Sequence, residues 1–298
     1  MSPAPAPLVE TTSLVKRFGR TTALEGLDLS VAEGEVHGFL GPNGAGKSTT
    51  IRVLLGLIRA TSGSAQVFGL DPWRDSVRIH RDIAYVPGDV SLWPGLTGGE
   101  AIDLLTFLRG GADAALCATL IDEFEFDPRK KARTYSKGNR QKVALIAAFA
   151  RPARLYILDE PSSGLDPVME AVFRRQIERV RADGATVLLS SHILSEVEEL
   201  CDRVTIIRSG VVVESGTLGD LRHLSRTSIR VAGLDASAVA AMAGVNDVRT
   251  VADALEFEVD AEAVPAVLAA LSTHPVTGLR VAPASLESLF LRHYSEAK

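Results

Sequence analysis

The sequence has 298 residues, of which 46% are apolar, and a formal net charge of −5 at pH 7. A chain of this size can bury one large core or two smaller ones, and its acidic balance argues against nucleic acid as a partner. No apolar run approaches the ~18 residues that a membrane-spanning helix needs. We therefore expect a folded protein of one or two domains that does not cross a membrane by itself.

Two features indicate where the chain resides. The N-terminal segment 1–7 lacks the basic start and apolar core of a signal peptide. The two cysteines, Cys117 and Cys201, lie far apart without the spacing of a metal site, so we expect both to be reduced. Both observations predict a cytoplasmic protein.

Residues 8–222 alternate between apolar strand-like runs and helical patterns, which is typical of an α/β domain with a largely parallel sheet. The expected strands span 36–40, 83–86, 155–158, 186–189 and 204–207. Helices are expected over 49–59, 100–109 and 142–150. The part from about 75 to 140 is mostly helical, so we expect a helical subdomain there, with a breaker-rich loop over 92–99.

A glycine-rich loop follows the first of these strands and precedes the first helix. It matches the phosphate-loop pattern G-x-x-x-x-G-K-[ST], whose backbone N–H groups and helix N-terminus bind phosphate oxygens. A plain glycine-rich turn is the simpler alternative, but the strand–loop–helix context opposes it. The motif predicts binding of ATP or another nucleoside triphosphate with Mg²⁺, through Gly41, Pro42, Asn43, Gly44, Ala45, Gly46, Lys47, Ser48 and Thr49.

Two carboxylates end the apolar strand at 155–158. Asp159 is expected to lie near Ser48 and to hold Mg²⁺ directly or through water, and Glu160 suits a general base that orients the attacking water. Farther upstream, Ser136 and Gly138 stand just before a long helical run. They indicate either an ordinary helix cap or a second anion site at a helix start.

The segment Tyr135–Gln141 resembles the signature motif of ATP-binding-cassette (ABC) ATPases, in a variant form with Lys137 and Asn139. Residues 8–220 as a whole are similar to this family, in the order of its motifs. The resemblance implies a P-loop NTPase core of ABC type, with a mixed sheet and a helical subdomain. It also assigns Asp166 as the D-loop carboxylate, His192 as the switch histidine at the γ-phosphate, and Phe18 as an aromatic stacked on adenine.

One position departs from the family pattern. Gly88 stands where the family usually has a glutamine that reaches Mg²⁺ and the attacking water. Glycine has no side chain that could ligate a metal. We hypothesise that Asp89 or a water molecule takes this place.

The resemblance also implies how the protein works. Two subunits, either a homodimer or a pair with a similar chain, would enclose two Mg-ATP between them and drive a separate integral-membrane permease. The chain would then be attached peripherally to the cytoplasmic face of the membrane. The variant signature favours the drug and antibiotic exporter branch. A soluble ABC-type clamp on nucleic acid or ribosomes and an importer ATPase are the alternatives.

Residues 227–298 contain no glycine-rich loop and no catalytic group of residues. The pattern predicts a small α+β domain with the order βαββαβ, of ferredoxin-like or related type. A final helix is expected over 285–294. This part resembles, more weakly, the C-terminal domain that some exporter ATPases carry.

Overall fold

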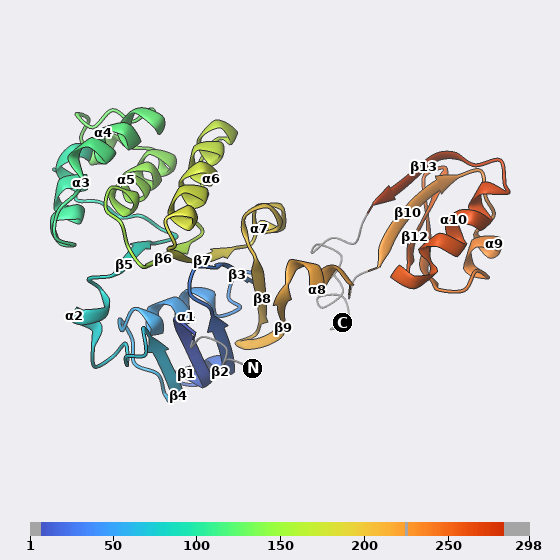
Figure 1. The fold of residues 1–298 in the computed structure, drawn as a ribbon, viewed down its shortest axis with the longest axis horizontal. Helices are drawn as coiled ribbons and strands as arrows, with labels where there is room; N and C mark the ends of the chain where they lie inside the picture. Colours follow the sequence, from blue (N-terminus) through green and yellow to red (C-terminus); the bar gives the residue numbers. More distant parts are fainter. Residues whose placement is uncertain (1–6, 224–225, 283–298) are drawn as a thin grey trace. The chain divides into compact units, whose positions relative to one another are not determined.

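The computed structural model describes residues 7–223 and 226–282. The chain folds into two compact units, Met1–Ser215 and Gly216–Lys298 (Figure 1). The helix expected over 285–294 lies outside the described residues. The two units are described separately below.

A six-stranded sheet forms the centre of the first unit, in the order β5-β6-β7-β3-β8-β9. Strands β3, β5, β6, β7 and β8 pair in parallel, and β3, β6 and β7 are buried along their whole length, as expected of a sheet covered on both faces. Because the strands are parallel, their carboxyl ends meet at one edge. The bounds are β3 (Val36–Leu40), β5 (Ile83–Val86), β6 (Leu155–Asp159), β7 (Thr186–Ser191), β8 (Arg203–Arg208) and β9 (Val211–Thr217).

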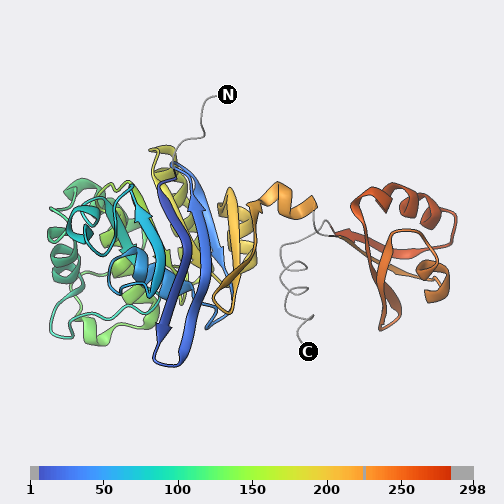
Figure 2. The same cartoon turned by 90° about the horizontal axis from the view of Figure 1, so that it is seen from below.

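A separate antiparallel sheet, in the order β2-β1-β4, comes from the start of the chain and was not among the predicted elements. Its strands are β1 (Val9–Phe18), β2 (Thr21–Val31) and β4 (Ser62–Val67); β1 and β2 run side by side as long strands in Figure 2. Leu14 and Leu27 from this sheet share one core with Ile51 of α1 (Lys47–Leu54) and Leu188 of β7. The shared core holds the helix after the glycine-rich loop against both sheets.

Most helices of the first unit belong to the middle of the chain. They are α2 (Ser76–Ile79), α3 (Gly98–Phe107), α4 (Ala114–Glu123), the short 3₁₀ turn η1 (Ala132–Thr134), α5 (Lys137–Phe149), α6 (Pro167–Ala182) and α7 (Leu194–Leu200). Helices α3 and α4 both pack against α5, and the three gather in one group in Figure 1. Thr97 and Glu100 form a reciprocal capping box that begins α3.

Three helices differ from their predicted bounds. The helix expected over 49–59 ends at Leu54, because Gly56 adopts a φ of +64° where a Cβ would lie 2.1 Å from the carbonyl oxygen of Pro72. The helix expected over 142–150 begins at Lys137, since Ser136 caps it. The helix expected over 100–109 spans 98–107, where its capping box starts it earlier.

The second unit has the order βαββαβ after a short helix α8 (Leu218–His223), as predicted. Its sheet runs β11-β12-β10-β13, antiparallel throughout. Ile229, Phe257 and Leu271 belong to a separate apolar core. The elements are β10 (Thr227–Ala232), α9 (Ala236–Ala240), β11 (Val245–Val251), β12 (Ala254–Val259), η2 (Ala261–Ala263), α10 (Val264–Ser272) and β13 (Thr277–Ala282).

Within residues 7–223 and 226–282, no helix is both long enough and apolar enough to span a bilayer. Both cysteines are free thiols, with Cys201 buried and Cys117 half-buried, in agreement with the expectation that they are reduced.

Candidate active site

The glycine-rich loop between β3 and α1 has no room for a side chain at two of its glycines. Gly46 adopts a φ of +114°, and a Cβ there would lie 2.8 Å from the side chain of Leu24. A Cβ at Gly41 would lie 2.5 Å from the carbonyl oxygen of Ile207. The carbonyl of Ala45 accepts a hydrogen bond of 2.8 Å from the amide of Gly210. The loop is therefore held tightly against β2 and the end of β8.

Lys47 begins α1 and is buried, with 5% of its surface exposed. Its Nζ donates hydrogen bonds to the carbonyl oxygens of Gly41 (2.5 Å) and Pro42 (3.2 Å). Burial lowers the pKa of Lys47, and the nearby carboxylates of Glu160 and Asp159 oppose that shift. The ammonium group thus lies inside the loop, partly removed from water, where an anion would be held strongly.

The carboxyl end of β6 brings two carboxylates to the same place. Asp159 is buried and accepts a hydrogen bond of 2.5 Å from Ser190 Oγ at the end of β7. Glu160 has a left-handed φ of +48°, which is a strained conformation for a residue with a side chain. Its amide donates to the carbonyl oxygen of Ser190 (3.0 Å).

Three of the predicted residues therefore converge. Glu160 Oε1 lies 3.9 Å from Lys47 Nζ and 3.3 Å from His192 Nδ1. These side chains follow β3, β6 and β7, so the adjacency of three parallel strands brings Lys47 to residues more than a hundred positions later in the chain. His192 remains half exposed, as a residue that contacts a substrate from solvent would.

The loop fits the triphosphate and the metal that the sequence predicts. Ser48 is exposed in the first turn of α1, and the hydroxyl of Ser48 and the carboxylate of Asp159 are hard oxygen donors of the kind that Mg²⁺ prefers. No acidic residue lies in the first turn of α1 and no side chain caps it, so its N–H groups can donate hydrogen bonds to an anion. A Cβ at Gly44 would meet open space.

The remaining loop residues divide by exposure. Asn43 and Gly44 are exposed, Ala45 is buried, and Pro42 and Thr49 are half-buried. These positions agree with a loop whose backbone, rather than its side chains, provides the binding groups.

The predicted signature residues form a second group of contacts. Ser136 caps α5, and its Oγ accepts a hydrogen bond from the amide of Asn139 (3.2 Å). A Cβ at Gly138 would lie 2.4 Å from the carbonyl oxygen of Gly164, so glycine is required there for packing. Lys137 Nζ donates to Ser163 Oγ (2.6 Å). The start of α5 is thus packed on the segment that follows Glu160.

Two other predicted residues lie at element ends. Asp166 caps α6 by accepting hydrogen bonds from the amides of Val168 and Met169, both at 3.0 Å. Phe18 ends β1 with 47% of its surface exposed, and Lys16 Nζ lies 4.8 Å from the centre of its ring. The exposed ring is free to stack on a planar group.

Gly88 lies beside the end of β6. A Cβ at this position would be 3.2 Å from the carbonyl oxygen of Asp159, so a side chain there would face the predicted metal ligand. Asp89 is exposed, and whether it or water substitutes for glutamine stays a prediction.

Sequence reasoning gave no role to several polar residues that hold this site. Ser190 binds Asp159, Gln141 Nε2 donates to the carbonyl oxygen of Pro161 (3.0 Å), and Glu196 accepts from Ser191 Oγ (2.7 Å). The serines stand directly before His192, so their place at a strand end was a usable signal. Nothing in the pattern of the sequence distinguished Glu196 from the neighbouring glutamates of α7.

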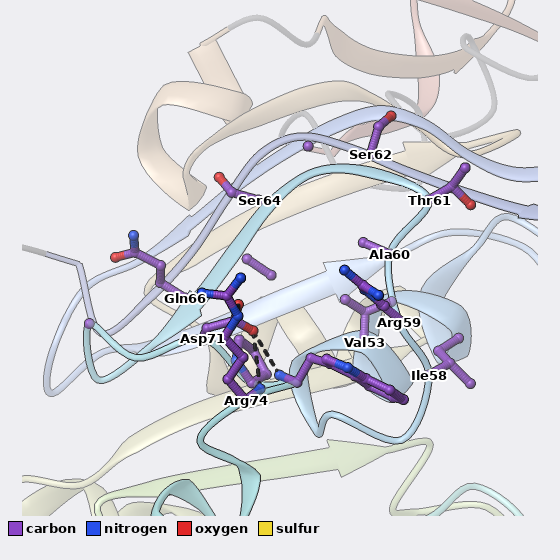
Figure 3. Close-up of a pocket in the computed structure, with 15 residues that line it drawn as sticks. Val53, Ile58, Arg59, Ala60, Thr61, Ser62, Ser64, Gln66, Asp71 and Arg74 are labelled. Carbon is purple, nitrogen blue, oxygen red and sulfur yellow. Dashed lines mark hydrogen bonds and ion pairs between the residues drawn. The ribbon is translucent and has the colours of Figure 1, made fainter.

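An open pocket of about 670 Å³ is separate from this site (Figure 3). It is lined by β4, by the end of the α1–β4 connection and by the turn over 71–74. Arg74 pairs with Asp71 at 3.6 Å, and both are largely exposed. The pocket shares no lining residue with the glycine-rich loop.

Comparison with known proteins shows the family of this chain. The family model described as ABC transporter matches residues 24–163. The chain is 39% identical over 227 residues to the daunorubicin/doxorubicin resistance ATP-binding protein DrrA of Streptomyces peucetius, covering 74% of this chain and 69% of that protein. It is 33% identical over 304 residues to the linearmycin resistance ATP-binding protein LnrL of Bacillus subtilis (strain 168), covering 95% and 97%.

Solved structures agree as well. The structure of an ATP-binding subunit of an ABC transporter matches with a TM-score of 0.68 at 34% identity, over 73% of this chain and 92% of that one. A dimeric bacterial ABC transporter cassette, MJ0796, shares the fold with a TM-score of 0.63 at 23% identity, over 70% and 98%.

Proposed function

This chain belongs to the family of ABC transporter ATP-binding proteins, and from that premise we propose that it is the ATP-hydrolysing subunit of a membrane exporter that removes a drug or antibiotic from the cell. The fold class predicted from the sequence is confirmed, and the chain is an ATPase by family. The observation that carries the site assignment is the convergence of Lys47, Glu160 and His192 at the ends of three adjacent strands.

Lys47 and the loop residues would bind the triphosphate. In this structure the ammonium group of Lys47 donates hydrogen bonds to the carbonyl oxygens of Gly41 and Pro42. When ATP binds, it would donate to phosphate oxygens in their place. That exchange is favourable because a charged acceptor forms a stronger hydrogen bond than a neutral carbonyl. Phe18 would stack on the adenine ring.

Glu160 would accept the proton of the attacking water, and His192 would contact the γ-phosphate. The strained backbone of Glu160 directs its carboxylate toward both Lys47 and His192. Ser48 and Asp159 would hold Mg²⁺, which when bound neutralises charge on the phosphate oxygens. Ser190 keeps Asp159 in a single orientation through its hydrogen bond.

The signature segment would act on a second subunit. Gly138 packs against Gly164 in its own chain and Ser136 caps α5, and in a head-to-tail dimer they would face the ATP bound by the partner, together with Asp166. A cassette with the same fold is described as dimeric, which supports a homodimer or a pair with a similar chain.

An integral-membrane permease would form the pathway for the transported molecule and would hold this chain at the cytoplasmic face of the membrane. Trp93 is half exposed, and Leu92 and Leu96 are half-buried, so the loop over 92–99 offers apolar surface for that contact. The names of DrrA and LnrL support drug or antibiotic cargo.

The test uses tagged Glu160→Gln chain in its native cells. We expect this variant to retain ATP in a closed dimer, to sediment with membranes and to copurify with one polytopic membrane protein. Lys47→Ala is the matched control, since it would not form the closed dimer. Recovery of ribosomes or nucleic acid without a membrane protein would contradict the exporter proposal in favour of a soluble clamp.

A further inference from the structure

A buried carboxyl group close to the candidate active site has no part in the steps described above. Glu196 lies on α7, four residues after His192, and only 5% of its surface is exposed. Burial raises the pKa of Glu196. A buried acid costs stability unless its oxygens find hydrogen-bond partners, so its partners indicate why it is there.

Two serines next to the catalytic residues face the carboxyl group of Glu196. Ser191 Oγ donates to Glu196 Oε2 at 2.7 Å, and the hydroxyl of Ser162 lies beside the same carboxyl group and lowers its pKa. Ser191 and Ser162 are buried, at 2% and 6% exposure. Ser191 directly precedes His192, and Ser162 follows Glu160 by two positions. Glu196 therefore links the segment after β6 to the segment after β7.

Two other contacts between these segments lie closer to the sheet. Ser190 Oγ donates to Asp159, and the amide of Glu160 donates to the carbonyl oxygen of Ser190. Both contacts hold the strand ends together. The link through Glu196 is made beyond this point, where each segment turns away from the sheet.

We propose that Glu196 is a positioning residue for ATP hydrolysis, which holds the Glu160 and His192 segments together through Ser162 and Ser191. It keeps Glu160 Oε1 and His192 Nδ1 at their separation of 3.3 Å. The proposal rests on the proposed function, because it takes the roles of Glu160 and His192 from there. Glu170 and Arg174 of α6 also lie near the carboxyl group of Glu196.

Removal of the carboxyl group leaves two buried hydroxyls without their partner. The two segments can then shift relative to each other, and a displacement of about 1 Å at a catalytic group can lower a rate by about a hundredfold. The contacts of Lys47 and the glycine-rich loop do not depend on Glu196. The defect should consequently appear in kcat and not in the KM for ATP.

The experiment compares Glu196→Ala, Glu196→Gln and Glu199→Ala in the purified full chain. Glu199 is the matched control, since it lies on the same helix but is half exposed and paired with Arg174. We expect E196A to lower kcat by about 10- to 100-fold with a KM within about twofold of wild type. Because an amide can replace the hydrogen bonds, we expect E196Q to retain kcat within about threefold, and E199A to be unchanged.

A purely structural role would give a different result. If E196A lowers Tm but leaves kcat unchanged, or if E196Q falls as far as E196A, the proposal is wrong. Should E196A fail to fold, Ser162→Ala and Ser191→Ala each remove one of the two links, and normal kcat in both would overturn the proposal.

Failure of the proposed function would be visible separately. If the wild-type chain binds ATP without hydrolysing it, the proposed ATPase function is wrong. If the Glu160→Gln variant has normal turnover, the general-base role of Glu160 is wrong. Both results can be obtained before Glu196 is tested.

Discussion

The two units of the chain differ most in what they bury. In the first unit, Lys47, Asp159 and Glu196 are buried. Lys47 donates to the carbonyl oxygens of Gly41 and Pro42, and serine hydroxyls donate to Asp159 and Glu196. In the second unit, within residues 226–282, the buried side chains are apolar. Its charged residues pair across the exposed faces of its strands, as Arg230 and Glu256 do at 3.1 Å.

Buried polar groups of this kind indicate chemistry in the first unit, whereas the apolar core of the second unit indicates packing alone. Burial of a charge costs free energy that its partners repay only in part, whereas apolar burial stabilises the fold directly. A unit that keeps buried charges near one sheet edge retains them for a task other than stability. The second unit carries no such group among its described residues. Variants in each unit test this contrast.

Loss of the buried cation should abolish activity. We expect Lys47→Ala to reduce ATP turnover to background, because no other side chain in the loop supplies positive charge to the phosphates. Phosphate release measured against ATP concentration tests this expectation. Lys131→Ala is the control, since Lys131 pairs with Glu100 at the surface (3.7 Å) and its loss should change nothing. Normal turnover in Lys47→Ala would remove the phosphate-loop assignment.

Loss of the general base should separate binding from hydrolysis. We expect Glu160→Gln to lower kcat by about 10²- to 10⁴-fold while ATP still binds, because the amide keeps the shape of the side chain but cannot accept the proton. Equilibrium binding and single-turnover hydrolysis should be measured on the same preparation. Glu33→Gln, which alters a surface pair with Arg154, serves as the control. Hydrolysis at the normal rate would show that another group acts as base.

A cavity in the second unit should affect that unit alone. Phe257 is 2% exposed in its core, so Phe257→Ala should destabilise the second unit by about 3–5 kcal/mol and leave ATP turnover by the isolated chain unchanged. Both tryptophans, Trp73 and Trp93, lie in the first unit.

Tryptophan fluorescence therefore reports unfolding of the first unit, and hydrogen exchange over 226–282 reports the second. A shift of the tryptophan transition in Phe257→Ala would mean that the two units unfold together.

Loss of the exposed aromatic ring should weaken nucleotide binding moderately. We expect Phe18→Ala to raise the KM for ATP by about 3- to 10-fold, since an aromatic stacking contact contributes about 0.5–1.5 kcal/mol, with a smaller effect on kcat. Phe107→Ala, which removes a more exposed ring from α3, should leave KM unchanged. If both variants change the KM for ATP equally, Phe18 makes no specific contact with adenine.

The smallest effect is expected at the position that departs from the family pattern. Gly88→Gln adds a side chain beside Asp159, and about 1 kcal/mol of strain there would lower kcat by about fivefold. Gly95→Gln is the control, because a Cβ at Gly95 meets open space. Unchanged ATP hydrolysis and unchanged coupling to the permease in Gly88→Gln would show that this position takes no part in hydrolysis or in its coupling to transport.

Much of the site could be predicted because its signals are local in the sequence. The spacing of glycines before Lys47 and the carboxylates that end the strand at 155–158 identified nucleotide chemistry before any fold was known. The βαββαβ order of the second unit followed from periodicity alone. These features depend on a few consecutive residues, and the backbone conformation and the chemistry of such a stretch are set by the residues themselves.

Only the tertiary structure decided which distant residues meet. It ended α1 at Leu54, because Gly56 lies against Pro72, and it paired the first strands of the chain into a separate sheet. It also selected Glu196 from the acidic residues of α7 by burying it between Ser162 and Ser191. Contacts of this kind depend on strand order and helix packing, which bring together residues far apart in the chain, and no local pattern of residues encodes them.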